Sequence, residues 1–158
     1  MKKVFISILI SLFFQASFAH AFELDDFTGK KVNLEDKIGQ GKWTLVMFWA
    51  HDCSLCRAES PAISEFFDRR KDVDVIGISI DGEANKALSK AFLAEVNPSF
   101  PSYLSELPLV AVNYKVLTQE DFRGTPTFLL FNPEGDLLGN NPGPMSTEAL
   151  ERFIERNS

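Results

Sequence analysis

The sequence is short of cysteine, of basic residues and of long apolar runs. Its 158 residues include only 2 cysteines, 9 glycines and 8 prolines, which excludes a disulfide-rich small protein, a collagen-like chain and a low-complexity chain. The 16 basic residues are outnumbered by 22 acidic ones, and a net charge of −6 disfavours binding to a phosphate backbone. We therefore expect no nucleic-acid partner. The chain does have 15 phenylalanines, enough to build a core without metals or cross-links.

The most apolar stretch lies close to the N-terminus. Lys2 and Lys3 precede 11 mostly apolar residues, Val4 to Phe14, and small residues follow as far as Ala19-His20-Ala21. This order is typical of a secretory signal peptide with an A-x-A cleavage site. The alternative is an uncleaved anchor, but a membrane-spanning helix needs about 20 apolar residues.

We expect cleavage after Ala21, with Ala19 as the second choice, so that residues 1–21 form a signal peptide and residues 22–158 form one domain. Loss of Lys2 and Lys3 would leave 14 basic residues against the 22 acidic ones and change the net charge from −6 to −8. The exported protein would then work in an oxidising compartment, the periplasm of a bacterium, where nearby cysteines become oxidised unless something reduces them.

Hydrophobic periodicity predicts alternating strands and helices in residues 22–158. Strands are expected at 22–24 and 32–34, paired as an N-terminal hairpin, and at 43–49, 73–80, 127–131 and 137–138. Helices are expected at 53–69, 84–95 and from Ser146 onward. Residues 43–49 are almost all apolar, which is typical of a central strand buried on both faces. The order indicates an α/β fold with a mixed central β-sheet flanked by helices.

Two details of the middle of the chain follow from the same patterns. Asp81-Gly82 is expected to cap the helix at 84–95, in which Leu88, Phe92 and Leu93 repeat at helical spacing. Residues 97–108 contain three prolines and are expected to be irregular, followed by a short helix or turn at 110–114.

Both cysteines lie in one motif, Cys53-Ser54-Leu55-Cys56, between the buried strand and the start of a helix. The strand–CxxC–helix order is typical of a redox motif. A helix N-terminus offers unpaired N–H groups and the positive end of the macrodipole, which stabilise a thiolate on Cys53. Cys56 follows one turn later, near enough to resolve a mixed disulfide.

Other uses of the two cysteines remain open. A structural disulfide would close a very short loop and would therefore remove little chain entropy. Closed zinc coordination needs four ligands, whereas the mature chain offers Cys53, Cys56 and at most His51. Two thiolates suit Cu(I), so a copper carrier stays an alternative.

The chain resembles the TlpA/ResA-like thiol-disulfide oxidoreductases of the thioredoxin superfamily over essentially all of residues 22–158. The resemblance rests on four features: Phe48-Trp49-Ala50 before the CxxC motif, Pro61 in the following helix, Gly124-Thr125-Pro126-Thr127 before a strand, and the turn at 132–135. It implies a thioredoxin fold. Residues 75–122 exceed what a minimal thioredoxin needs and are similar to the central insertion of the TlpA branch.

The resemblance also implies roles for individual residues. Cys53 would be the nucleophile and Cys56 the resolving thiol, and Thr125-Pro126 would form a cis-proline loop that docks the substrate chain. Trp49 would pack beneath the site. Glu59 matches the acid of Cys-x-x-Cys-x-x-Glu and would handle the proton of Cys56, because Met47 stands where many thioredoxins have a buried aspartate.

The sequence departs from the family at Asp52, where tryptophan is common before the first cysteine. A carboxylate there disfavours a thiolate on Cys53, whereas a protonated His51 would favour it. No cofactor is expected besides a redox-active Cys53–Cys56 disulfide, and no metal.

We expect an exported thiol-disulfide oxidoreductase that reduces disulfides in client proteins, an apocytochrome c among the candidates. It would be re-reduced by a membrane-bound thiol donor. A disulfide oxidant or isomerase and the Cu(I) carrier are the alternatives.

Overall fold

The computed structural model describes residues 22–158, so the predicted signal peptide, residues 1–21, lies outside the described residues. Within the described part, one sheet has the strand order β2-β1-β5-β4-β3-β6-β7. The strands are β1 Glu23–Asp25, β2 Lys31–Asn33, β3 Trp43–Trp49, β4 Val73–Ser79, β5 Ser102–Leu104, β6 Thr127–Phe131 and β7 Leu137–Pro142. The sheet is mixed: β3, β4 and β5 run parallel, and the other pairings are antiparallel.

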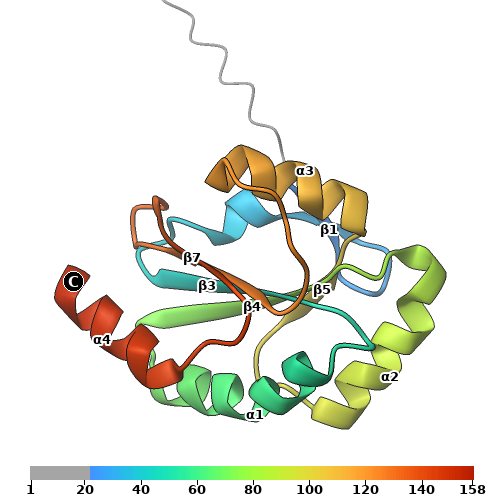
Figure 1. Cartoon of the computed structure of the whole chain (residues 1–158), viewed down its shortest axis with the longest axis horizontal. Helices are drawn as coiled ribbons and strands as arrows, with labels where there is room; N and C mark the ends of the chain where they lie inside the picture. Colours follow the sequence, from blue (N-terminus) through green and yellow to red (C-terminus); the bar gives the residue numbers. More distant parts are fainter. Residues whose placement is uncertain (1–21) are drawn as a thin grey trace, which may run out of the picture.

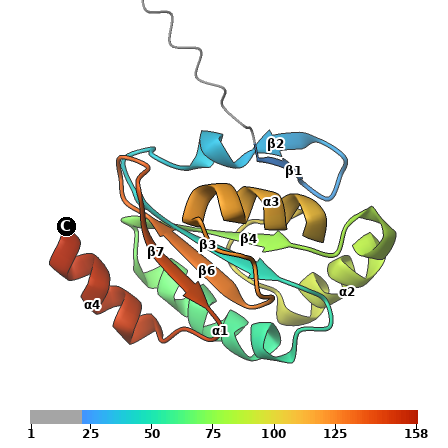
Figure 2. The same ribbon diagram turned by 45° about the horizontal axis from the view of Figure 1, so that its top comes forward.

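Helices cover both faces of this sheet (Figures 1 and 2). The α-helices are α1 Ser54–Arg69, α2 Lys86–Val96, α3 Leu107–Thr118 and α4 Thr147–Asn157, and two short 3-10 helices are η1 Leu34–Lys37 and η2 Glu83–Asn85. Helices α1, α2 and α4 lie on one face and α3 lies on the other (Figure 2). The β1–β2 hairpin forms one edge of the sheet, and its buried side chains join the core on the α3 side. The predicted mixed sheet flanked by helices is therefore confirmed.

The central strand β3 shows why a nearly continuous apolar run forms here. Its side chains alternate between two cores: Leu45, Met47 and Trp49 pack with α1, α2 and α4, whereas Val46 and Phe48 pack with α3 and the hairpin. Because successive side chains in a strand point to opposite faces, a strand covered on both sides needs apolar residues at every position. The whole strand is buried, as predicted.

Most predicted elements are found within a residue or two of their expected bounds, but β7 continues to Pro142 instead of ending at 138, and the segment between β4 and β6 also differs. Residues 102–104 form a strand where irregular chain was expected. This strand is too short to show periodicity, and it is held by pairing with β4 and, at Leu104, with Asp25 of β1. Helix α3 is longer than the predicted 110–114, because Pro108 occupies its first turn, where proline needs no N–H partner.

The start of α2 is also a correction. Asp81 is not its cap, because the N-cap is Asn85 and the intervening residues form η2. Leu88, although in helical phase with Phe92, is 49% exposed, whereas Ser89 is fully buried. Both differences have one cause: the Asp81 side chain points to the β3–α1 loop and accepts a hydrogen bond from Ser89 Oγ at 2.6 Å, so a serine takes the inward position.

Candidate active site

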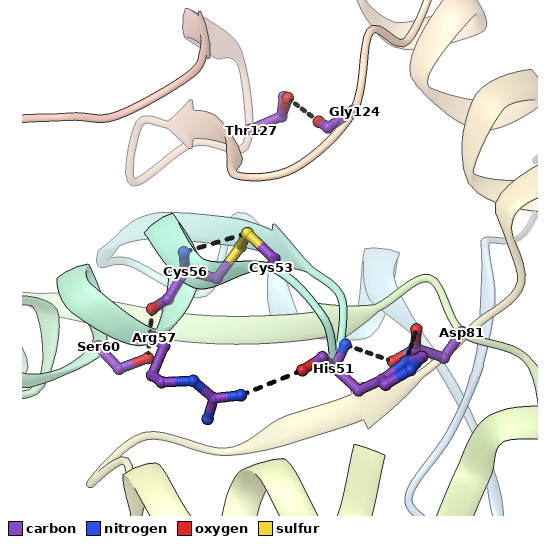
Figure 3. The surroundings of a disulfide bond; sticks show 8 residues. All are labelled: His51, Cys53, Cys56, Arg57, Ser60, Asp81, Gly124 and Thr127. Carbon is purple, nitrogen blue, oxygen red and sulfur yellow. Dashed lines mark hydrogen bonds and ion pairs between the residues drawn. A yellow bond between two sulfur atoms is a disulfide. The ribbon is translucent and has the colours of Figure 1, made fainter. Parts of the chain in front are cut away.

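The two cysteines lie at the N-terminus of α1, immediately beyond the carboxyl end of β3, and form a disulfide (Figure 3). Cys53 is the N-cap residue of α1, and its backbone N–H donates to Ala50 O at 3.1 Å. Its Sγ accepts a hydrogen bond from the Cys56 backbone N–H, with 3.1 Å between the sulfur and the nitrogen. This N–H is one of the donors that a helix leaves unpaired in its first turn, and it would equally stabilise a Cys53 thiolate.

The two sulfur atoms differ in access. Cys56 is completely buried in the core beneath α1, whereas Cys53 is partly exposed. Ser60 Oγ donates to the carbonyl oxygen of Cys56 at 2.9 Å and thus ties Cys56 further into the helix. An external sulfur can therefore reach Cys53, and Cys56 is placed to react only with its neighbour.

The loop that carries Thr125 and Pro126 faces the disulfide from another part of the chain (Figure 3). Strand β6 runs antiparallel to β3, with Thr127 opposite Phe48, so the residues before Thr127 lie at the end of β3 where the CxxC motif follows. The Thr125–Pro126 peptide bond is cis. Both residues line a surface hollow of about 310 Å³ together with Arg123, Gly124, Thr127, Pro142 and Gly143.

Glu59 lies one turn after Cys56 on α1 and points to the loop before α4. Its Oε1 accepts a hydrogen bond from the backbone N–H of Met145 at 2.7 Å, and its buried Oε2 has no hydrogen-bond partner within residues 22–158. Burial raises the pKa of Glu59 above its ordinary value, and the Met145 hydrogen bond opposes this rise only in part. A carboxyl group of raised pKa is suited to proton transfer near neutral pH.

Trp49 lies beneath the disulfide rather than on the substrate side of it. Its side chain is 2% exposed and stacks on Phe92 of α2, with ring centroids 4.7 Å apart. It belongs to the same core as Cys56. Burial in this core places Trp49 where it supports the residues of the site from inside the protein.

Sequence reasoning missed Asp81 and Arg57, which hold the loop before Cys53 (Figure 3). His51 donates its backbone N–H to Asp81 Oδ2 at 3.0 Å, and its Nδ1 lies 2.8 Å from Oδ1 of the same carboxylate. Arg57 donates from Nη2 to the carbonyl oxygen of His51 at 3.3 Å. The sequence contained one clue: the carboxyl ends of neighbouring parallel strands meet at one edge of a sheet, and His51 and Asp81 each follow such a strand.

Residues 22–158 contain neither a cluster of metal-ligating side chains nor a helix able to cross a membrane. No group of three histidine, cysteine, aspartate or glutamate side chains in this range is arranged to hold a metal ion. None of its helices combines the length and apolar character that a membrane crossing requires.

The CxxC disulfide lies at the N-terminus of α1, after a central strand of a mixed sheet and beside a cis-proline loop. This combination defines a thiol-disulfide oxidoreductase of thioredoxin fold. Proteins of this class exchange disulfides with protein substrates and redox partners. The chain belongs to the AhpC/TSA family, whose match spans residues 16–138.

The chain is also similar in sequence or structure to individual proteins of this class. The thiol-disulfide oxidoreductase ResA of Bacillus subtilis is 27% identical over 142 residues, which cover 89% of this chain and 74% of ResA. The exposed lipoprotein thioredoxin of Streptococcus pneumoniae superposes with a TM-score of 0.68 at 26% identity, covering 86% of this chain and 98% of that one. A secreted Mycobacterium tuberculosis disulfide oxidoreductase shares the fold, with a TM-score of 0.66, 22% identity and coverage of 86% and 96%.

Proposed function

We propose that this protein is exported and reduces disulfide bonds in client proteins through a Cys53–Cys56 dithiol. The observation that carries the proposal is the unequal access of the two sulfurs: Cys53 is partly exposed at the helix N-terminus, and Cys56 is completely buried beside it. This arrangement supports one attacking and one resolving thiol. The resemblance to the ResA-like branch supports the reductive direction.

Each cycle would transfer two electrons to the client. The Cys53 thiolate attacks one sulfur of a client disulfide, the client S–S bond breaks, and the departing client thiolate takes up a proton. A mixed disulfide between Cys53 and the client remains. Cys56 then loses its proton and attacks Cys53 Sγ, which releases the second client sulfur as a thiol and leaves the Cys53–Cys56 disulfide.

Glu59 would accept the proton that Cys56 loses. Its position one turn along α1 and its raised pKa support this role, because burial makes the Glu59 carboxylate a stronger proton acceptor than an ordinary glutamate. Thr125 and Pro126 would receive the extended client segment next to Cys53, in the hollow that their loop lines.

The oxidised protein then needs an external source of electrons. We propose that a membrane-bound dithiol donor reduces the Cys53–Cys56 disulfide by the same exchange and becomes a disulfide itself. An apocytochrome c, whose haem-attachment cysteines must be reduced before they bond to haem, is our candidate client.

Export is proposed from the basic and apolar pattern of residues 1–21. We expect the secreted protein to begin at Phe22, or at His20 if cleavage follows Ala19. N-terminal sequencing of protein recovered from the extracytoplasmic fraction tests this expectation. A retained Met1 would show that no signal peptide had been removed.

The reduction potential of the couple distinguishes a reductase from an oxidant. We expect a value near the thioredoxin potential of about −270 mV, because the couple must be more reducing than the client disulfides. Equilibration with dithiothreitol or glutathione buffers, followed by alkylation and mass measurement, gives the potential. A value near the DsbA potential of about −120 mV would make the protein an oxidant and contradict the proposal.

A further inference from the structure

The peptide unit of His51 is held from both sides, two residues before the reactive Cys53. On one side, Asp81 binds both the backbone N–H and the ring Nδ1 of His51, at 3.0 and 2.8 Å. On the other side, Arg57 of α1 donates to the His51 carbonyl oxygen at 3.3 Å. Figure 3 shows the His51 ring directed to Asp81 and away from the disulfide.

Asp81 is itself fixed by its surroundings. Its side chain is 5% exposed, and Oδ2 also accepts hydrogen bonds from Ser79 Oγ at 2.7 Å and Ser89 Oγ at 2.6 Å. Burial disfavours ionisation of Asp81, but the hydrogen bonds from Ser89, Ser79 and His51 outweigh it, so its pKa lies below the ordinary value. An ionised carboxylate only accepts hydrogen bonds, so His51 Nδ1 carries the hydrogen.

Arg57 is also anchored. Its Nη1 lies 2.6 Å from Glu95 Oε2 of α2, and its guanidinium lies 4.8 Å above the ring of Phe92. Phe92 in turn stacks on Trp49, the last residue of β3. The loop between β3 and α1 is therefore attached to α2 and to the end of β4, not only to its own neighbours in the chain.

We propose that His51 and Asp81 are positioning residues for Cys53, holding the residue 50–52 loop so that the Cys53 sulfur stays at the N–H groups of α1. The inference rests on the proposed function for its consequence in catalysis. It assigns His51 a role through its hydrogen bond to Asp81 rather than through a positive charge on the ring.

The position of Cys53 matters because helix-terminus stabilisation of an anion acts only within the first turn. The Cys53 sulfur lies 3.1 Å from the Cys56 nitrogen, and a loosened loop would lengthen this contact. The neighbouring Asp52 carboxylate disfavours a thiolate, so Cys53 depends on the helix donors to offset that repulsion. Fixing the loop thus preserves the thiolate that starts the exchange.

The test compares His51→Ala with His51→Asn in the reduced protein. Asparagine places its amide N–H near the position of His51 Nδ1 and can donate to Asp81, but it carries no charge. The rate of Cys53 alkylation by iodoacetamide is followed across the acidic part of the pH profile, where the rate is proportional to the thiolate fraction. We expect His51→Ala to lower it about twofold to fivefold, the size of a helix-terminus interaction, and His51→Asn to restore it.

The Asp81→Asn variant distinguishes the loss of loop positioning from the loss of a negative charge, because the two change the thiolate fraction of Cys53 in opposite directions. Removal of a negative charge near Cys53 would by itself increase the thiolate fraction, whereas loss of positioning decreases it. We expect Asp81→Asn to decrease the thiolate fraction of Cys53 and therefore its alkylation rate. Asp74→Asn is the matched control, because Asp74 is exposed, pairs with Lys42 and lies at the opposite end of β4; it should leave alkylation unchanged.

Three results would overturn the inference: an unchanged rate in His51→Ala, an Asn variant as impaired as the Ala variant, or a faster rate in Asp81→Asn. Since the His51 side chain is a quarter exposed on a loop, its two variants can decide the matter even if Asp81→Asn does not fold. Alkylation requires no client, so this pattern in a protein that fails to reduce any client would contradict the proposed function alone.

Discussion

Replacing Cys56 with serine should convert the protein from a turnover catalyst into a trap for its clients. Cys53 would still attack a client disulfide, but no thiol would then be available to release the client from the mixed disulfide. Cys56 is the only other cysteine of the chain, so no second thiol of the protein can take its place in resolving the mixed disulfide. We expect complete loss of turnover and accumulation of client adducts, visible on non-reducing gels and identifiable by mass spectrometry.

Cys53→Ser is the matched control for this experiment. It removes the accessible sulfur and leaves the buried one, so it should lose turnover equally but trap nothing. Adducts should also disappear when dithiothreitol is added before electrophoresis. If Cys56→Ser forms no adducts while Cys53→Ser does, the assignment of attacking and resolving thiols is reversed; if neither forms adducts when the reducing donor is present, reduction of protein clients is contradicted.

Replacing Glu59 with glutamine should slow the release of the client rather than its capture. Glutamine has nearly the same shape and can still accept the Met145 hydrogen bond through its Oε1, but it cannot accept the proton of Cys56. We expect resolution of a preformed mixed disulfide to slow by about 10²-fold, the lower end of general acid–base contributions, with the initial attack unchanged. Rapid-quench kinetics with a labelled client separate the two steps.

Glu65→Gln is the control, because Glu65 lies on the same helix but is 80% exposed and pairs with Arg69 at 3.4 Å. It should resolve mixed disulfides at the wild-type rate. Equal resolution rates in Glu59→Gln and the wild type would remove Glu59 from the mechanism.

The raised pKa of Glu59 also has a signature in stability. The folded state favours the protonated carboxyl, so its stabilising contribution is complete below the ordinary value of 4.5 and is lost as the pH rises through the folded-state pKa. Relative to Glu59→Gln, the wild type should therefore lose free energy of unfolding between acidic and neutral pH. Urea unfolding of both proteins at each pH measures this difference; a difference that does not change with pH would contradict the raised pKa.

Elements with strong local patterns could be predicted from the sequence. Strand β3 has apolar residues on both faces, and α1 begins at a cysteine cap and continues with apolar residues at helical spacing. Both patterns lie within a dozen or so residues, where periodicity decides between strand and helix. The terminal helix α4 likewise begins after the Ser146 cap, whose side chain accepts from Ala149 N–H.

Elements that depend on distant partners could not be predicted in this way. Strand β5 exists because β4 and β1 supply hydrogen bonds on its two edges, and its three residues carry no periodic signal of their own. Helical spacing groups Leu88 with Phe92 and Leu93, but the buried Asp81 needs a hydroxyl donor, and Ser89 occupies the inward position instead.

The same division holds for the candidate site. The CxxC pair is a contact between residues three apart on one helix turn, so the amino-acid sequence alone determined that Cys53 and Cys56 meet and that a helix N-terminus lies beneath them. His51 and Asp81 are 30 residues apart, and Glu59 and Met145 are 86 apart. Only the order of strands in the sheet and the packing of α4 against α1 brought these groups together, because contacts across such separations depend on the whole arrangement of the chain rather than on any local pattern.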